Sequence, residues 1–465
     1  MTVAVSYPET YPVEETFQLL KIPWEWYEPG RDYDVVIARK ADVPGYDGPL
    51  IDLTDNDVFR KICDLLNHGQ PHLHEPLCDI ELDHLRQELK KHTILVEIPP
   101  CPWGHPYMVA LTHDVDLTSV KECRWTTVGY AAYQCLAQGR IMSGLRLLAA
   151  RLGLGKDPWN LFEQWKGFEQ DMGVRSTFFF VSMPGKTGRA AHPYRAVSYV
   201  PDTKVMQLLT ESGWEAGVHG IDNWIDADEG RMEMGRLGLS GAGNRTHWLL
   251  FDDRSWMTLD KAGYSYDTTF GYNGDAGFRA ATLQAYRPES VENLLELPLH
   301  IQDLGLFGTF CWAPTADGWE KTPCLHLPEK EARDHCNRIL DYARQYGGNV
   351  TLLWHYENLV PPRDWSGLYR DLVSRAKADG AWVTTAGNVV AWFRERRHVS
   401  VTCRFAENTV SITQEGAHTL NSPHPFRVRI HMPSNRSIST EAEYVRGEEY
   451  IDIKMNRKCI KVSWV

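Results

Sequence analysis

The chain has 465 residues, 43% of them hydrophobic, and its 61 acidic and 49 basic residues give a formal net charge of −12. A chain of this length can bury a sizeable core and is expected to form roughly two to four domains. The acidic balance argues against nucleic-acid binding, because contact with a duplex needs a basic face. A small or lipid-linked substrate is the better expectation.

The N-terminal residues 1–18 lack the basic and apolar regions of a secretory signal, and no run of about 18 uninterrupted apolar residues occurs in the sequence. We therefore expect a cytoplasmic protein. Its ten cysteines are scattered and never form a CxxC pair, which favours free buried thiols over a zinc ribbon or a redox dithiol.

Residues 1–105 mix short apolar stretches with a helix-like segment, 57–69, whose last residue, Gly69, suits a helix end. They predict a small N-terminal α/β domain that ends in a proline-rich linker. Residues 399–465 alternate polar and apolar residues between turns, which predicts a small antiparallel β domain. That domain has two interpretations, accessory packing or the binding of a carbohydrate or a partner.

Residues 106–398 alternate short apolar strands with amphipathic helices, a pattern typical of a parallel α/β barrel or sheet. The helices are expected at 159–173, 203–213, 329–348 and 367–380. The strands are expected at 107–111, 176–182, 215–219, 246–250, 295–298, 350–355 and 382–384.

Residues 123–156 contain five basic residues and no acidic one. Within them, the segment 140–156 places leucines and an isoleucine on one helical face and arginines on the other. One interpretation is an ordinary amphipathic helix on the barrel exterior. The other is a basic helix that makes a peripheral membrane contact through 140–156.

Four stretches carry polar residues where predicted strands end: "THDVD" (112–116), "WEAGVHGIDNW" (214–224), "AGNRTHWLLFD" (242–252) and "TLLWHYENL" (351–359). One histidine at a strand end is more often structural than functional. Here three recur along the chain, together with two aspartates, and the catalytic residues of such folds gather at one face. The five residues are Asp114, Asp116, His219, His247 and His355.

With these motifs, residues 106–398 resemble the polysaccharide deacetylase, or NodB-homology, family of carbohydrate esterases. The resemblance implies an α/β fold, a deformed (β/α) barrel of NodB-homology type, flanked here by the N-terminal α/β domain (1–105) and the C-terminal antiparallel β domain (399–465). It implies that Asp114 is the catalytic base and Asp116 a metal ligand.

The later motifs extend this resemblance. It implies that His219 is a metal ligand and that Arg245 holds the base. The backbone amide of Trp248 would help to form an oxyanion hole, Asp267 would be the acid of the fourth motif, and His355 the general acid.

The chain departs from the family where a second metal-binding histidine is usual, since that position is Asn223. Three residues are candidates for the third ligand. Asp222 and His247 rank together, because a carboxylate or an imidazole binds a divalent ion more strongly than the amide of Asn223 does. The alternative for Asp222 is a helix N-cap. The expected cofactor is a divalent metal ion, with zinc as the first choice.

The loop 267–282 is glycine-rich and follows a predicted strand, so it is expected to shape the substrate pocket. Its Tyr272 and Arg279 are candidate substrate contacts, as are His113 and Trp248. An arginine here could clamp a phosphate or carboxylate, or form a surface salt bridge instead. His113 could equally pack under the strand end.

The resemblance implies a metal-dependent deacetylase that hydrolyses the N-acyl group, N-acetyl as the first choice, of an amino sugar in surface polysaccharide biosynthesis. Its partner would be an amino-sugar-containing glycan or a nucleotide- or lipid-linked precursor. Two alternatives remain. The first is a non-carbohydrate amide hydrolase on the same fold, and the second a catalytically inactive glycan-binding homologue.

Overall fold

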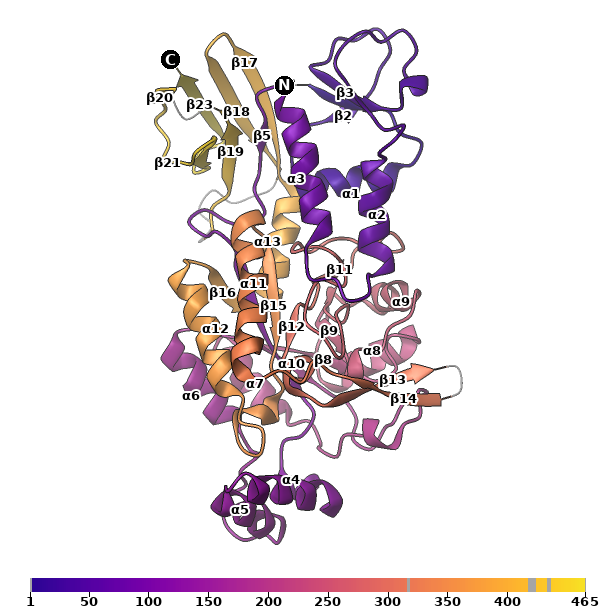
Figure 1. The fold of residues 1–465 in the computed structure, drawn as a ribbon, viewed down its shortest axis with the longest axis vertical. Helices are drawn as coiled ribbons and strands as arrows, with labels where there is room; N and C mark the ends of the chain where they lie inside the picture. Colours follow the sequence, from indigo (N-terminus) through magenta and orange to yellow (C-terminus); the bar gives the residue numbers. More distant parts are fainter. Residues whose placement is uncertain (1, 316–317, 417–423, 433–435, 465) are drawn as a thin grey trace.

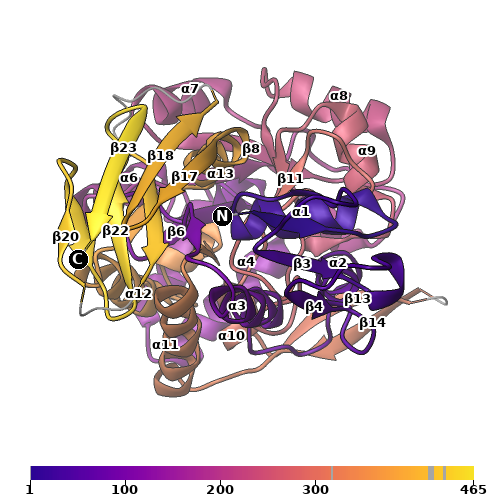
Figure 2. The same ribbon diagram turned by 90° about the horizontal axis from the view of Figure 1, so that it is seen from above.

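The structure, a computed structural model, describes residues 2–315, 318–416, 424–432 and 436–464. A central α/β body carries the N-terminal and C-terminal units side by side at one end, and a helical hairpin projects from the opposite end (Figure 1). Viewed from above, the two terminal units occupy separate halves of the molecule (Figure 2).

The central body is built on nine parallel strands in the order β11-β10-β9-β8-β7-β6-β15-β12, with β16 also pairing β6. The two ends of this path, β11 and β12, are joined by residues 297–300 alone, so the sheet curls round on itself without closing by hydrogen bonds among the described residues. This confirms the α/β class and the deformed (β/α) barrel. The strands are β6 (Met108–Val115), β7 (Thr177–Phe180), β8 (Glu215–Gly220), β9 (Gly243–Thr246), β10 (Tyr266–Asp267), β11 (Leu295–Glu296), β12 (Ile301–Gln302), β15 (Asn349–Leu353) and β16 (Trp382–Thr385).

Helices cover this sheet, and the four expected ones form close to their expected bounds. The longest, α11, buries Ala332, Cys336, Ile339, Leu340 and Ala343, which recur at helical spacing on one face. The helices of the body are α6 (Phe162–Met172), α7 (Thr203–Glu211), α8 (Ala227–Arg236), α9 (Ser255–Ala262), α10 (Asp303–Phe307), α11 (Glu329–Tyr346), α12 (Ser366–Ala378) and α13 (Ala386–His398). None of the helices in the described ranges has the length and apolarity needed to cross a membrane.

The strand expected at 246–250 is wrong. The chain leaves the sheet at Thr246, and His247–Leu249 forms a single 3-10 turn in which Trp248 and Leu249 have φ of 67° and 51°. A left-handed backbone cannot continue a strand, and it is costly for residues other than glycine. The strands β10 and β12 were not predicted, because two residues are too few to show a period.

The N-terminal unit is a parallel sheet of order β2-β1-β3-β4 packed on three helices. Its Gly69 ends α2 with a positive φ, as expected. The elements are β1 (Val3–Val5), α1 (Thr10–Leu20), β2 (Glu25–Trp26), β3 (Val35–Ala38), β4 (Leu50–Asp52), α2 (Val58–His68) and α3 (Leu77–Lys90).

The C-terminal unit has two antiparallel sheets, β17-β18-β23-β20 and β21-β22-β19-β5. The edge strand β5 (Val96–Glu97) comes from the segment before the barrel and pairs with β19, so this unit is completed by an N-terminal segment. The exact divisions at 105/106 and 398/399 stay predictions. The other strands are β17 (Ser400–Ala406), β18 (Thr409–Glu415), β19 (Arg427–His431), β20 (Ile438–Ser439), β21 (Tyr444–Arg446), β22 (Tyr450–Lys454) and β23 (Cys459–Trp464).

Two hairpins leave the barrel. One is the two-stranded sheet of β13 (Phe310–Thr315) and β14 (Gly318–Pro323). The other joins the helices α4 (Trp125–Ala137) and α5 (Ile141–Arg151), which follow β6.

Candidate metal centre and active site

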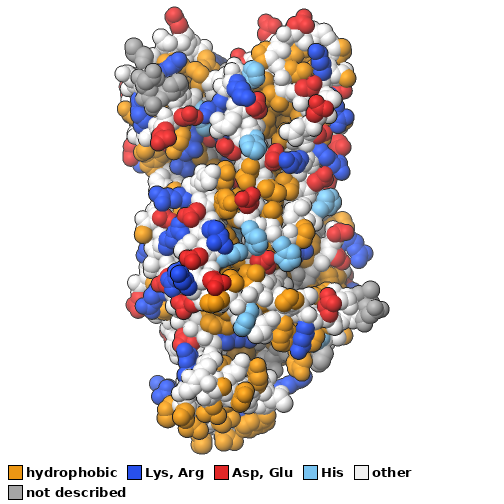
Figure 3. Space-filling model, viewed as in Figure 1, with side chains coloured by type: hydrophobic (Ala, Val, Ile, Leu, Met, Phe, Trp, Pro, Cys, Tyr) orange, Lys and Arg blue, Asp and Glu red, His pale blue; other side chains and the backbone are white. Residues whose placement is uncertain are grey.

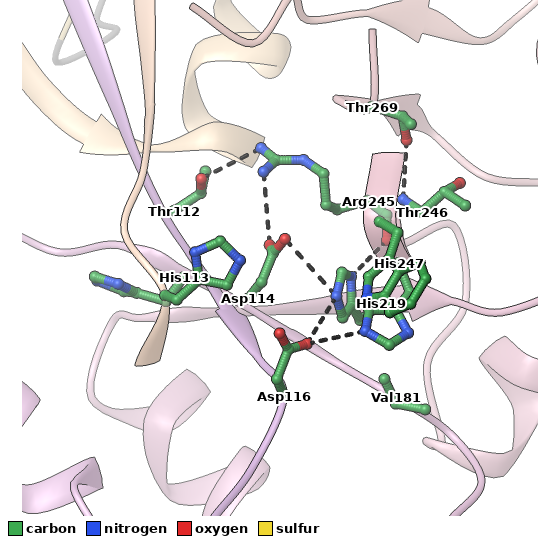
Figure 4. Close-up of polar contacts among 12 residues, drawn as sticks. Thr112, His113, Asp114, Asp116, Val181, His219, Arg245, Thr246, His247 and Thr269 are labelled. Carbon is green, nitrogen blue, oxygen red and sulfur yellow. Dashed lines mark hydrogen bonds and ion pairs between the residues drawn. The ribbon is translucent and has the colours of Figure 1, made fainter. Parts of the chain in front are cut away.

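Asp116, His219 and His247 meet at one edge of the sheet, and one ligand atom of each lies within 4.8 Å of the others. Asp116 Oδ1 is 3.3 Å from His219 Nε2 and 3.4 Å from His247 Nε2 (Figure 4). Asp116 and His247 directly follow β6 and β9, and His219 lies near the end of β8. The carboxyl ends of parallel strands meet at one edge, which brings these residues together.

The hydrogen bonding of His219 shows that this group suits a cation. Its Nδ1 lies 2.8 Å from the Arg245 carbonyl oxygen, so Nδ1 donates and Nε2, which faces Asp116, is the atom that can hold either a proton or a metal ion. When Nε2 is unprotonated, it and Asp116 Oδ1 are two acceptors at 3.3 Å, which repel each other unless a cation lies between them. Asp116 Oδ1 is buried and accepts no hydrogen bond from the described residues. Two imidazole nitrogens and one carboxylate, with a ring N–H fixed by a carbonyl, are a donor set that zinc accepts.

The surroundings shift the pKa values of the two histidines in opposite directions. Burial lowers the pKa of His247 well below its ordinary value, so its ring is neutral near pH 7. Burial also opposes a charge on His219, but Asp114 and Asp116 raise its pKa overall. A proton and a metal ion therefore compete for Nε2 of His219, and metal binding would release that proton.

Asp114 lies beside the metal centre and against Arg245. Its Oδ1 is 3.6 Å from Arg245 Nη1, and its Oδ2 is 3.7 Å from His219 Nε2. Arg245 Nη2 donates to the Thr112 hydroxyl at 3.3 Å (Figure 4). It also donates to the Thr268 hydroxyl at 3.2 Å, so the guanidinium is held from β6 on one side and from the end of β10 on the other. Asp114 Oδ1 is buried without a hydrogen-bond partner among the described residues, which leaves it free to accept a proton.

His355 is held by Asp303, a residue that the sequence did not single out. The Nδ1 of His355 is 2.6 Å from Asp303 Oδ1, and its backbone N–H donates to Asp303 Oδ2 at 2.8 Å. Burial opposes protonation, but Asp303 raises the pKa of His355 to about 10, with Asp116 adding to the effect. His355 is therefore a cation at neutral pH. The sequence offered one indication of Asp303, which is its position soon after the mostly apolar residues 297–301.

Asp267 was predicted as a catalytic acid, and the structure does not bring it to His355. It is fully buried, and its Oδ1 accepts from Asn244 at 2.8 Å and from Thr269 at 2.6 Å. Burial raises its pKa, and the pKa of neighbouring Glu296 is raised further by burial and by Asp267. Asp267 therefore lies in a buried polar cluster with Asn244 and Thr269. The carboxylate that contacts His355 is that of Asp303.

Neither Asp222 nor Asn223 reaches the metal centre, so His247 is the third member of the group. Asp222 Oδ1 accepts from the Arg189 backbone N–H at 2.9 Å, and its Oδ2 is 3.4 Å from Lys186 Nζ. The N-cap of α8 is Asp226. No helix begins at His219, because β8 runs to Gly220, so residues three and four positions on do not share its face.

Asn223 instead donates to Asn244 Oδ1 at 2.6 Å and to the Tyr264 hydroxyl at 3.2 Å. Asn244 also donates to Asp267, so Asn223 belongs to the same buried polar cluster.

Three predicted substrate contacts lie in structural positions instead. His113 is buried between the Trp354 carbonyl, 2.7 Å from Nδ1, and Glu169, 3.0 Å from Nε2. The Tyr272 hydroxyl donates to the Gln70 carbonyl and accepts from the Leu73 N–H, so it ties the loop to the N-terminal unit.

Arg279 donates to the Gly271 carbonyl at 3.0 Å and packs on the ring of Phe270, 4.4 Å from its centroid. Its side chain is occupied within its own loop and is not available as a clamp for a phosphate or carboxylate. Trp248 is the predicted contact that does line a cavity.

Two adjoining cavities lead to the metal centre. The smaller, about 190 Å³, is lined by Asp116 and His247. The larger, about 1050 Å³, shares with it Leu117, Thr127, Trp248 and Glu357, and extends between the α4–α5 and β13–β14 hairpins. Burial and the charge of Asp116 raise the pKa of Glu357 to about 7.

The strand topology and these residues define a deformed (β/α) barrel with a candidate metal centre at the carboxyl edge of its sheet. Neither a protein-family model nor a curated protein sequence matches the chain. Among solved structures, the chain is similar to a candidate polysaccharide deacetylase from Mycobacterium smegmatis, with a TM-score of 0.40 and 19% identity over 67% of this chain and 100% of that one. It is also similar to Puue allantoinase, with a TM-score of 0.37 and 12% identity over 64% of this chain and 93% of that one. At these values neither structure assigns a reaction to this chain.

Proposed function

We propose that the protein is a metal-dependent amide hydrolase that removes an N-acyl group, N-acetyl as the first choice, from an amino sugar in a glycan or glycan precursor. The observation that supports this proposal is that the carboxylates of Asp114 and Asp116 and the imidazoles of three histidines lie where β6, β8, β9 and β15 end. The histidines are His219, His247 and His355. Asp116, His219 and His247 would hold the ion. Bound zinc supplies Lewis-acid chemistry, which lowers the pKa of water and polarises an acyl carbonyl.

Asp114 is the proton acceptor in this proposal. When water attacks the acyl carbon, a new C–O bond forms and the water proton passes to the Asp114 carboxylate. Arg245 orients that carboxylate, because its own position is fixed by Thr112 and Thr268.

His355 is the proton donor. As the C–N bond breaks, the amine nitrogen takes a proton from His355, and the products are a carboxylic acid and a free amine. Asp303 keeps the proton on His355 until then, since it raises the pKa of that imidazole to about 10. Because Nδ1 points at Asp303, the proton that leaves is the one on Nε2.

An amino-sugar substrate is supported by the larger cavity. Its volume of about 1050 Å³ exceeds what an N-acetyl group alone needs, and Trp248, Trp312 and Trp365 are among its walls. Flat aromatic rings bind the apolar faces of a sugar, while Lys321 and Arg363 on the same walls can bind its polar substituents. Synthesis of a surface polysaccharide is the setting that the motif resemblance implies.

The test is amine release from a panel of N-acyl compounds. Protein stripped by a chelator and reloaded with zinc is incubated with N-acetyl and N-formyl amino sugars, their nucleotide-linked forms, and cyclic and ureide amides without sugar. Zinc-dependent amine release from a sugar supports the proposal. Release only from the sugar-free amides would contradict the amino-sugar substrate and support a non-carbohydrate amide hydrolase. No release from any compound, with zinc bound, would support an inactive binding protein.

A further inference from the structure

The α4–α5 hairpin stands apart from the barrel and has its own small core. Val128, Ala131, Cys135, Leu147 and Ala150 form a buried cluster separate from the main core of the protein. The hairpin projects from the end of the molecule opposite the two terminal units (Figure 1). Its inner face is therefore already occupied, and its outer face is presented to the surroundings.

That outer face is apolar to an extent found nowhere else on the described chain. Of its seventeen exposed large hydrophobic side chains, nine lie between residues 125 and 154 and are 47% to 65% exposed. Orange side chains gather at this end of the molecule in the space-filling view (Figure 3). We call this set the apolar patch: Trp125, Tyr130, Tyr133, Leu136, Ile141, Met142, Leu145, Leu152 and Leu154.

The sequence-based alternative of an ordinary helix packed on the barrel does not hold for this face. Ile141 and Leu145, which that alternative would bury, are 57% and 51% exposed, whereas Leu147 and Ala150 face α4. A contiguous apolar surface of this kind marks an interaction site in a folded protein.

The charged residues of the segment that carries the patch are all basic. Arg124, Arg140, Arg146, Arg151 and Lys156 lie in the segment 123–156, and all 61 acidic residues of the chain lie outside it. Arg124, Arg146 and Lys156 form no ion pair with the described acidic groups, while Arg140 pairs with Asp364 at 3.2 Å. Exposed tryptophan and tyrosine beside unpaired basic residues are the composition of an interfacial membrane anchor.

The patch borders the route to the metal centre. Thr127, Tyr130, Gln134 and Arg140 of the hairpin form one wall of the larger cavity, which reaches the metal centre through Trp248 and Glu357. A surface that docks on this patch would therefore lie at the mouth of the active site.

We propose that the α4–α5 hairpin docks the protein on an anionic phospholipid bilayer and that the N-acyl substrate is an amphiphile whose polar head enters the cavity from that surface. The second clause rests on the proposed function. At 13 and 11 residues, α4 and α5 are too short to span a bilayer, so they lie along its surface with the apolar patch among the acyl chains. A second copy of this chain is the competing occupant. It is less favoured, because two hairpins would bring two sets of basic residues together.

The test is vesicle flotation of the full-length protein. Vesicles of phosphatidylcholine with phosphatidylglycerol are compared with phosphatidylcholine alone. The variant Ile141→Glu/Leu145→Glu removes apolar contacts, and Arg146→Glu/Lys156→Glu reverses the charge. Leu208→Glu/Arg236→Glu, on the exposed faces of α7 and α8, is the matched control. We expect binding to the anionic vesicles only, weakened at least about tenfold in each hairpin variant and unchanged in the control. One variant removes apolar contacts with the acyl chains, and the other reverses the charge that attracts anionic lipid.

Three results would overturn the docking proposal: no flotation of the wild type, equal flotation of all variants, or a concentration-dependent dimer that Ile141→Glu/Leu145→Glu dissolves while no vesicle binds. Flotation needs no turnover, so it is independent of the reaction. Amine release from a short-chain soluble N-acyl sugar, expected to be equal in wild type and hairpin variants, tests the proposed function separately. An amphiphilic substrate is contradicted if the soluble sugar is hydrolysed but anionic vesicles that carry an N-acyl amino-sugar lipid give no amine release.

Discussion

Asp303 forms two hydrogen bonds with His355. One carboxylate oxygen lies 2.6 Å from Nδ1, and the other accepts the backbone N–H at 2.8 Å. Asn358 Nδ2 donates to the same Oδ2 at 2.6 Å, so the carboxylate is itself fixed. The pair sets both the tautomer and the charge of the imidazole. A buried histidine would otherwise be neutral, because burial alone lowers its pKa.

The first prediction concerns the pH dependence of turnover in Asp303→Asn. A general acid works only below its own pKa, which is about 10 for His355. Removing the Asp303 charge leaves burial to lower that pKa, so the alkaline limb of the kcat profile should move toward neutral pH, and activity at pH 8 should fall. The measurement is kcat from pH 6 to 10. An unchanged alkaline limb would show that His355 is not the proton donor.

The second prediction separates the candidates for the third metal ligand. His247→Ala removes one of three ligands and should weaken zinc affinity by about 10²-fold or more, whereas Asp222→Ala should leave it near the wild-type value, because Asp222 pairs with Lys186 and the Arg189 backbone. Competition with a chromogenic chelator measures both. If Asp222→Ala lost zinc and His247→Ala kept it, the assignment would be reversed.

The third prediction separates the base from the ligands. Asp114→Asn should retain zinc and lose turnover by about 10² to 10⁴, the usual contribution of a general base. Its matched control is Asp228→Asn on α8, whose side chain is 81% exposed. Elemental analysis and amine release are measured on the same samples. Loss of zinc from Asp114→Asn would make this residue a ligand.

The fourth prediction concerns Glu169, which accepts hydrogen bonds from His113, Ser176, Trp214 and Tyr369 in the core. Glu169→Ala leaves these donors unpaired and should lower the free energy of unfolding by about 3 to 5 kcal/mol. Glu163→Ala, on the same helix with its side chain 83% exposed, should change it by less than about 0.5 kcal/mol. Urea unfolding at pH 7 measures both.

The pH dependence of this stabilisation has a definite sign. Burial acts against it, but the hydrogen bonds from His113, Tyr369 and Trp214 lower the pKa of Glu169 in the folded protein. A carboxylate with a lowered folded pKa contributes stability above its unfolded pKa, about 4.3, and loses it as the pH falls through the folded value. The difference between wild type and Glu169→Ala should therefore shrink on acidification. A constant difference down to acid pH would contradict this network.

The sequence predicted most of the strands and helices of the barrel. It also singled out Asp116 and His219, two members of the candidate metal centre, because apolar strands ending in these residues leave a local signal. It left the third member open. Asp222 and His247 both offer good ligand atoms. The local sequence does not show that β8 ends at Gly220 and that Asp222 then contacts Lys186 and the Arg189 backbone.

The contacts that the sequence missed are long-range. Asp303 follows β12, a strand of two residues, and meets His355 52 positions later. Tyr272 was a reasonable substrate contact from its glycine-rich loop, yet its hydroxyl is bound by Gln70 and Leu73, some 200 positions away in the chain. Such pairings depend on how the domains pack, which local patterns do not encode.

The most direct test of the metal centre is a crystal structure of zinc-soaked protein with anomalous diffraction at the zinc edge. The account predicts one strong peak bound by an Asp116 carboxylate oxygen, His219 Nε2 and His247 Nε2, each at about 2.0 to 2.2 Å. A peak ligated by Asp222 in place of His247, or no peak near Asp116 in zinc-saturated crystals, would contradict it.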